Sequence, residues 1–277
     1  MAKHRGPSTV AEPRRVRAAQ RRWAAALLCG ATACQTTDRP KALDAGPAAG
    51  DDAGALDSAA GEAGPDPVLR GPLSLAWPVA EPSAFGSVIG VDHDPEVQPD
   101  TPLGRLTCAD HHDRAFPHCY DEHGGTDIIL TGGFSAMDAG SQPVIAAADG
   151  VVIATEDGHY DRCHASAETG SVDCDGHPMI ANHVILEHEA EDGTAWTTRY
   201  WHLKQGSVAV AIGEAVSAGH TLGLVGSSGF SSMPHLHFQL EDPSGQVVDP
   251  FAGPRSQPET FWCSPPEGEA PPGPCAG

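Results

Sequence analysis

Short apolar runs bounded by Gly, Pro and Asp are the feature that most constrains the fold of this 277-residue chain. Several runs alternate apolar with polar residues or are rich in β-branched side chains, and no long window keeps a helical period. These runs predict strands. We therefore expect a mostly β domain, an antiparallel β-sheet with long loops and little helix, with strands over 143–148, 151–155, 183–188, 196–203, 221–225 and 235–240.

One turn signal stands out among the links between these runs. Asp149 and Gly150 form a two-residue link between the runs 143–148 and 151–155. Asp-Gly is a preferred sequence for the tight turn of a β-hairpin, because both positions tolerate a positive φ. The sequence therefore predicts a hairpin at this point.

The amino-terminal region predicts export. Basic residues cluster between Lys3 and Arg22, and the apolar run 23–33 follows them directly. This is the layout of a secretory signal, and the run is too short to span a bilayer as a permanent helix. We expect residues 1–33 to be a signal peptide and the mature protein to be periplasmic or at the cell surface.

Cys34 follows the small residues 31–33, which can be an ordinary cleavage site or a lipobox whose cysteine is lipidated. Plain cleavage would leave seven of the eight cysteines and one unpaired thiol. Lipid on Cys34 would leave six, an even number that suits an oxidising compartment. We favour membrane anchoring through lipid on Cys34, although Ala replaces the usual Leu three residues before it. The other six cysteines then fall into the local pairs Cys108/Cys119, Cys163/Cys174 and Cys263/Cys275.

Composition divides the rest of the chain. Residues 34–70 are mainly Ala, Gly, Asp and Pro, which cannot bury enough apolar surface to fold, so we expect a disordered tether. Residues 71–255 hold the predicted strands, and 256–277 form a Pro-rich tail that a Cys263–Cys275 disulfide would close. The formal net charge of −21 excludes nucleic acid as a partner, because phosphate contacts require a cationic surface.

Three segments carry side chains that can bind a metal ion. His235 and His237 lie two apart in a predicted strand, so both imidazoles point to the same face. His123 and Asp127 flank two glycines, which indicate a close approach of the backbone to another group. His202 lies in another predicted strand, 196–203. Each segment alone also has a structural explanation, but two imidazoles and a carboxylate are ligands of catalytic Zn²⁺, which leaves a fourth position to water.

Most of the fifteen histidines have no such pattern. Two of them, at the ends of the predicted strand 183–188, are expected to be structural. Seven others lie in positions typical of loops, and solvent exposure is the simpler interpretation for them: His111, His112, His118, His159, His164, His177 and His220.

Taken together, the three segments resemble the lysostaphin/LytM family of zinc metallopeptidases, also called M23. The resemblance rests on a His-x-Gly-x-Asp motif from His123, a Tyr-x-His-Leu motif from Tyr200, and a His-x-His motif before Phe238. The run 143–152 is similar to the first hairpin of the family, and glycines between 206 and 229 follow its spacing. The match covers roughly residues 73–251.

The resemblance implies Zn²⁺ as the cofactor, with His123, Asp127 and His237 as its ligands. It implies His235 as the general base that takes a proton from the zinc-bound water, since a base must reach the water without holding the metal. Spacing alone does not distinguish which strand histidine binds zinc.

Two further roles follow from the resemblance. His202 would stabilise or protonate the developing oxyanion, and Tyr200 would assist by hydrogen bonding. The implied activity is that of a zinc-dependent endopeptidase that hydrolyses peptide bonds in peptidoglycan stems or cross-links. The alternatives are a catalytically silent module of the same fold that binds or activates cell-wall amidases, and a secreted protease with broader substrates.

The chain departs from the family pattern in one segment. Residues 156–180, which contain Cys163 and Cys174, are longer than the hairpin link common in the family. This insert has two interpretations, a wall of the substrate groove or a disulfide-stapled surface loop. The loop between Cys108 and Cys119 is expected to brace His123.

Overall fold

The computed structural model describes residues 70–97, 106–166, 171–265, 272 and 275. The predicted signal peptide, Cys34 and almost all of the predicted tether lie outside these ranges. Within them, no helix is both long enough and apolar enough to cross a bilayer.

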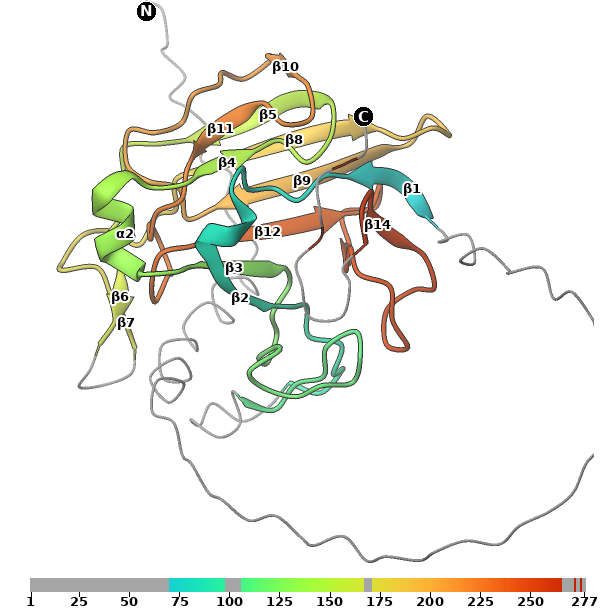
Figure 1. Ribbon diagram of the computed structural model, residues 1–277, viewed down its shortest axis with the longest axis horizontal. Helices are drawn as coiled ribbons and strands as arrows, with labels where there is room; N and C mark the ends of the chain where they lie inside the picture. Colours follow the sequence, from blue (N-terminus) through green and yellow to red (C-terminus); the bar gives the residue numbers. More distant parts are fainter. Residues whose placement is uncertain (1–69, 98–105, 167–170, 266–271, 273–274, 276–277) are drawn as a thin grey trace, which may run out of the picture.

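One antiparallel sheet of eight strands forms the centre of the fold. Its strand order is β10-β5-β8-β9-β12-β3-β2, with β13 paired to β12 off this path, and Figure 1 shows the series from β10 at the top to β2 at the bottom. The predicted mostly β, antiparallel fold is therefore confirmed. The strands are β2 (Phe85–Ile89), β3 (Thr126–Leu130), β5 (Gly150–Glu156), β8 (His183–Glu189), β9 (Ala195–Trp201), β10 (Ala215–Val216), β12 (His235–Glu241) and β13 (Val247–Val248).

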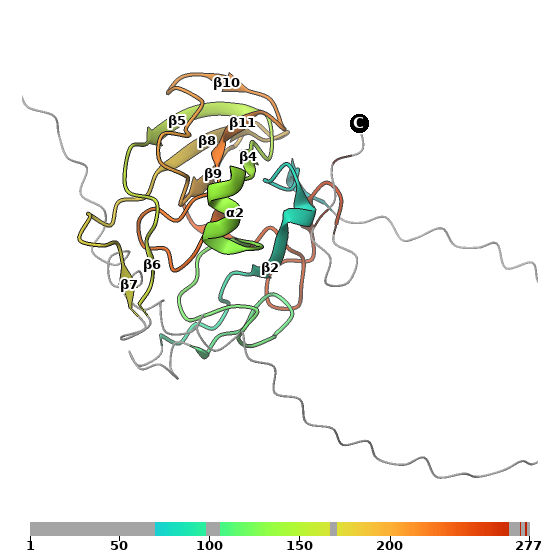
Figure 2. The same cartoon turned by 60° about the vertical axis from the view of Figure 1, so that its left-hand side comes forward.

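Three two-stranded sheets and two short helices complete the described structure. β4 pairs with β11, β6 pairs with β7, and β1 runs parallel to β14. The β6–β7 hairpin projects away from the central sheet in both views (Figures 1 and 2). The elements are β1 (Arg70–Leu75), η3 (Pro82–Ala84), α2 (Gly133–Gly140), β4 (Pro143–Ile145), β6 (His164–Ala165), β7 (Val172–Asp173), β11 (Thr221–Leu224) and β14 (Thr260–Trp262).

The two faces of the central sheet differ in polarity because side chains alternate along each strand. On β12, Leu236, Phe238 and Leu240 are fully buried in the main apolar cluster. Burial of a side chain of this size contributes roughly 1.5–3 kcal/mol. A shift of one residue would expose all three, so the apolar face fixes the register. The same register sends His235 and His237 to the opposite face.

The predicted strands are present, but the predicted hairpin is wrong. β4 pairs with β11, whereas β5 pairs with β8 and β10, so β4 and β5 lie in different sheets. Gly150 is the first residue of β5, where a Cβ atom would lie 2.6 Å from the carbonyl oxygen of Glu187. Glycine is therefore required by the close approach of β8. The glycine of the Asp-Gly pair, which predicted a turn, is thus explained by the packing of β5 against β8.

The ordered fold continues beyond residue 255. Trp262 in β14 is fully buried, and its ring lies 5.1 Å from that of Trp77 and 5.7 Å from that of Phe238. The first part of the tail thus belongs to the core. The Cys263–Cys275 disulfide is present, as are Cys108–Cys119 and Cys163–Cys174, so all three predicted pairs are confirmed.

Candidate metal centre

Two histidines and one aspartate meet on the polar face of the sheet. The register of β3 and β12 places Asp127 directly opposite His237, and His123 precedes β3. Asp127 Oδ1 lies 2.8 Å from His237 Nδ1 and 3.3 Å from His123 Nε2, and the two imidazole nitrogens are 3.3 Å apart. All three side chains are buried. The structure thus brings together the three residues that the resemblance implied as ligands.

This donor set fits a zinc ion. Tetrahedral Zn²⁺ takes imidazole and carboxylate ligands with bonds of about 2.0–2.2 Å, which separates neighbouring donor atoms by about 3.3–3.6 Å. Two of the three separations, at 3.3 Å, lie at the lower end of this range, and the third, at 2.8 Å, is shorter. Within the described residues, no other group of three His, Cys, Asp or Glu side chains has its donor atoms this close together.

A backbone carbonyl fixes the ring of His123. Its Nδ1 donates a hydrogen bond to the carbonyl oxygen of Gly90 at 2.6 Å. Because a carbonyl can only accept, the proton must be on Nδ1, and Nε2 keeps its lone pair toward Asp127. A second bond, from the backbone N–H of Asp92 to the carbonyl of His123, holds the same two segments together. The loop after β2 therefore orients the first candidate ligand.

His237 is held from two sides. Its ring stacks on Trp201, the residue paired with it on β9, with centroids 5.4 Å apart. Its Nε2 lies 3.4 Å from Gln239 Oε1, a weak contact that favours the proton on Nε2 and the lone pair on Nδ1. Gln239 in turn donates to Glu241, which forms a two-pronged ion pair with Arg199. No sequence motif indicated that Trp201 or Gln239 would support the site.

A buried tyrosine contacts Asp127. Tyr120 Oη donates to Asp127 Oδ2 at 3.0 Å, and burial, followed by the charge of this carboxylate, raises the pKa of the phenol well above its usual value. Burial alone would raise the pKa of Asp127, but His123 and His235 and the hydrogen bonds outweigh it and hold that pKa well below its usual range. Tyr120 is thus protonated while Asp127 is ionised. Tyr120 lies in a loop without a pattern, so sequence reasoning missed it.

Gly125 allows the backbone before β3 to pass against a candidate ligand. A Cβ atom at this position would lie 2.5 Å from His237 Cε1 and 2.7 Å from the carbonyl oxygen of Phe238. By contrast, the nearest atom to a Cβ at Gly124 is 3.6 Å away. The close approach predicted for the two glycines is therefore confirmed for Gly125 and is absent at Gly124.

A hydrogen bond to the backbone determines which nitrogen of His235 faces the site. Its Nδ1 donates to the carbonyl oxygen of Met233 at 2.7 Å, so Nε2 carries a lone pair in the neutral ring. This Nε2 lies 3.5 Å from Asp127 Oδ1. His235 is therefore beside the metal-binding atoms and has a free acceptor directed at them, as a general base requires.

An unusual backbone conformation directs His202 to the same place. Its φ is +67°, a region that non-glycine residues adopt rarely and often at functional sites. Nδ1 donates to the carbonyl of Ser228 at 2.7 Å, and the ring lies 4.6 Å from that of His235. Burial, followed by repulsion from His235 and His237, lowers the pKa of His202 well below its usual value. His202 is thus neutral, with its lone pair on Nε2.

Tyr200 does not reach the site, which corrects the prediction for this residue. It pairs with Phe238 on the core face of the sheet and is fully buried. Its hydroxyl accepts from the N–H of Ala147 at 2.9 Å and bonds Thr198 at 3.1 Å, and burial raises its pKa to about 12. Tyr200 is a core residue, and the residue that extends toward the candidate ligand is its neighbour Trp201.

Two other histidines are buried for structural reasons. His188 bonds the carbonyl of Asp149 and the hydroxyl of Thr198, as expected for a structural residue. His111 was expected to be solvated, but it is only 7% exposed and stacks on Phe251 with centroids 4.9 Å apart. That expectation was wrong because the aromatic partner comes from a segment far away in the chain.

The insert packs against the turn that holds His202. Cys163 is fully buried, and its N–H and carbonyl bond the carbonyl and hydroxyl of Ser227. Ser228, the next residue, accepts the hydrogen bond of His202, and its hydroxyl accepts another from the N–H of Asn182, two residues after the insert. The insert is thus more than a surface loop, because it braces one side of the candidate site.

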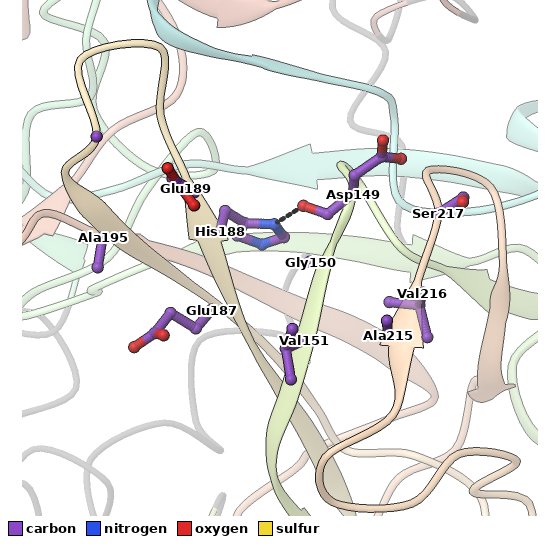
Figure 3. A pocket seen from close by; sticks show the side chains of 11 residues that line it. Asp149, Gly150, Val151, Glu187, His188, Glu189, Ala195, Ala215, Val216 and Ser217 are labelled. Carbon is purple, nitrogen blue, oxygen red and sulfur yellow. Dashed lines mark hydrogen bonds between the residues drawn. The ribbon is translucent and has the colours of Figure 1, made fainter.

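A hollow lies at the other end of β8 and β9 (Figure 3). Its wall includes Glu187, Glu189 and the backbone of Asp149. His188 points toward Asp149 in Figure 3, and both of its ring nitrogens are bonded. The hollow therefore carries acidic groups, but neither ring nitrogen of His188 is free to bind a metal.

Comparison with known proteins shows a similarity to one peptidase family. Residues 122–250 match the model of "Peptidase family M23". Peptidoglycan DD-endopeptidase ShyA of Vibrio cholerae is 33% identical over 118 residues, which are 43% of this chain and 20% of the relative. Peptidoglycan DD-endopeptidase ShyB of the same organism is 34% identical over 64 residues, 23% of this chain and 14% of the relative. The chain thus matches about a fifth or less of the length of these relatives.

Among the solved structures similar to this chain is a zinc-containing peptidase from Vibrio cholerae. It is 22% identical with a TM-score of 0.39, and the match covers 64% of this chain and 39% of that one. The catalytic domain of lysostaphin from Staphylococcus simulans has 24% identity, a TM-score of 0.30, and coverage of 50% and 82%. The matched range 122–250 includes the three candidate ligands, His202 and His235. The part of the chain that contains the candidate site is therefore similar to peptidase family M23.

Proposed function

We propose that the domain is a zinc-dependent endopeptidase that hydrolyses peptide bonds in peptidoglycan stems or cross-links. The observation that carries the proposal is the convergence of five side chains. Asp127 Oδ1 lies within 3.5 Å of nitrogens of His123, His235 and His237, and the ring of His202 lies 4.6 Å from that of His235. A silent module would need only the fold, whereas this site retains both the ligands and the proton-transfer groups.

In the proposed mechanism, His123, Asp127 and His237 would hold Zn²⁺, which would supply an acidified water and polarise the substrate carbonyl. His235 Nε2 accepts a proton during attack, because its Nδ1 proton is engaged by Met233. The neutral His202 also has its lone pair on Nε2. It can therefore donate to the oxyanion or the leaving nitrogen only after Nε2 has gained a proton.

The relatives support the proposed substrate class. ShyA and ShyB are peptidoglycan DD-endopeptidases, and they match the segment that contains the site. A peptidoglycan peptide is therefore the substrate that we propose for this chain. The relatives do not determine which bond in the stem or cross-link is cut here.

Digestion of purified muropeptides, with products identified by mass, tests the activity. The zinc-loaded protein should cleave and a chelator should abolish cleavage. His235→Ala should lower kcat about 10²–10⁴-fold, the usual effect of losing a general base. His220→Ala is the matched control, since His220 is an exposed histidine on a loop, and it should keep full turnover. If the zinc-loaded wild type cleaves no muropeptide but stimulates an amidase, the silent-module alternative is correct.

We also propose that the chain is exported and anchored to a membrane by lipid on Cys34. The support is the signal-like segment 1–33 and the pairing, in three disulfides, of the six cysteines that follow Cys34. The intact mass of the protein extracted from membranes should include a lipid on Cys34. An unmodified amino terminus at Cys34 would contradict the anchor and leave the export proposal standing.

A further inference from the structure

Tyr120 contacts two of the three candidate ligands. Its hydroxyl donates to Asp127 Oδ2 at 3.0 Å, and its ring stacks on His123 with centroids 4.1 Å and planes 30° apart. Tyr120 is 5% exposed and follows Cys119, which is linked to Cys108. It also lies outside the range 122–250 matched by the family model. This support therefore comes from the loop that precedes the matched range.

The two oxygens of Asp127 have separate partners. Oδ1 faces His123 Nε2 and His237 Nδ1, whereas Oδ2 accepts the tyrosine hydroxyl. A hydrogen bond to the second oxygen of a carboxylate orients it and favours metal binding through the other oxygen. A carboxylate that binds through both oxygens would occupy the position that a catalytic zinc site leaves to water.

We propose that Tyr120 is a positioning residue of the metal centre, which fixes Asp127 as a ligand through Oδ1 alone and orients the ring of His123. The inference rests on the proposed zinc site. Tyr120 acts through the ligands, because its buried hydroxyl is already committed to Asp127.

The test compares Tyr120→Phe with Tyr160→Phe. Each change removes one tyrosine hydroxyl that donates to an aspartate, but Tyr160 bonds Asp175 in the insert. Competition with a chromogenic chelator should show zinc bound about 10–100-fold more weakly by Tyr120→Phe, the usual range for loss of a group that supports a ligand. Tyr160→Phe should keep the wild-type affinity.

A spectrum separates this role from general stability. With Co²⁺ in place of zinc, Tyr120→Phe should show weaker visible bands than the wild type, because the released carboxylate can raise the coordination number. Tyr120→Leu, which also removes the ring from His123, should bind zinc still more weakly. Wild-type affinity and an unchanged cobalt spectrum in Tyr120→Phe would overturn the inference.

Failure of the inference and failure of the zinc site have different signatures. If the wild type itself binds no zinc, the proposed function is wrong, and the inference falls with it. If Tyr120→Phe is unfolded without metal, the zinc concentration that refolds half of it measures the same affinity, because binding is then coupled to folding. A midpoint equal to that of Tyr160→Phe treated alike would contradict the positioning role.

Discussion

At the scale of single residues, backbone geometry decides which side chains reach the metal centre. Regular alternation would place Tyr200 and His202 on the same face of a strand. β9 ends at Trp201, and the positive φ of His202 breaks the alternation, so His202 enters the site while Tyr200 remains in the core. Both residues were therefore predicted as site residues, but the sequence pattern could not show that only His202 would lie in the candidate site.

The two glycines after His123 give a matched pair of variants. Gly125→Ala should weaken zinc binding about tenfold or more and destabilise the fold by about 1–3 kcal/mol, because its Cβ would overlap His237. Gly124→Ala should change neither quantity, since its Cβ has only ordinary contacts and neither glycine has a positive φ. Chelator competition and thermal unfolding measure both effects. Equal zinc affinity in the two variants would show that the approach of Gly125 to His237 is not tight.

At the scale of elements, apolar patterning predicted the strands well but not their neighbours. Runs that became β5, β8, β9 and β12 were found because each has one apolar face. The pairing of β4 with β11 was missed because it joins segments about 80 residues apart. β14 was missed because a Pro-rich tail hides Trp262, whose burial depends on β1 and Trp77.

The insert is the element whose role is most open to test. Replacement of Cys163 and Cys174 by Ser should leave zinc binding unchanged and lower turnover several-fold, because the Ser227–Ser228 turn that holds His202 loses its brace. A disulfide of this loop length contributes roughly 2–4 kcal/mol, so the melting temperature should also fall. The matched control replaces Cys263 and Cys275, which close a loop of similar length in the tail. Loss of turnover in neither variant would make the insert a surface staple only.

At the scale of the whole molecule, the fold class and the three candidate ligands that lie together could be predicted from the sequence, whereas the residues that support them could not. His123, Asp127 and His237 could be found because they belong to motifs with fixed spacing, whereas Tyr120, Trp201 and Gln239 support the site through contacts between distant segments. The net charge of −21 and the cysteine pairing do not bear on the chemistry of the candidate site. The chemistry depends on the convergence of one carboxylate and the imidazoles around it.

Metal analysis of the purified protein, after equilibration with zinc and dialysis, tests that convergence most directly. The wild type and His235→Ala should each retain about one zinc per chain, and Asp127→Ala should retain none. A wild type without zinc, or an Asp127→Ala variant that keeps a full equivalent, would contradict the assignment of the metal centre.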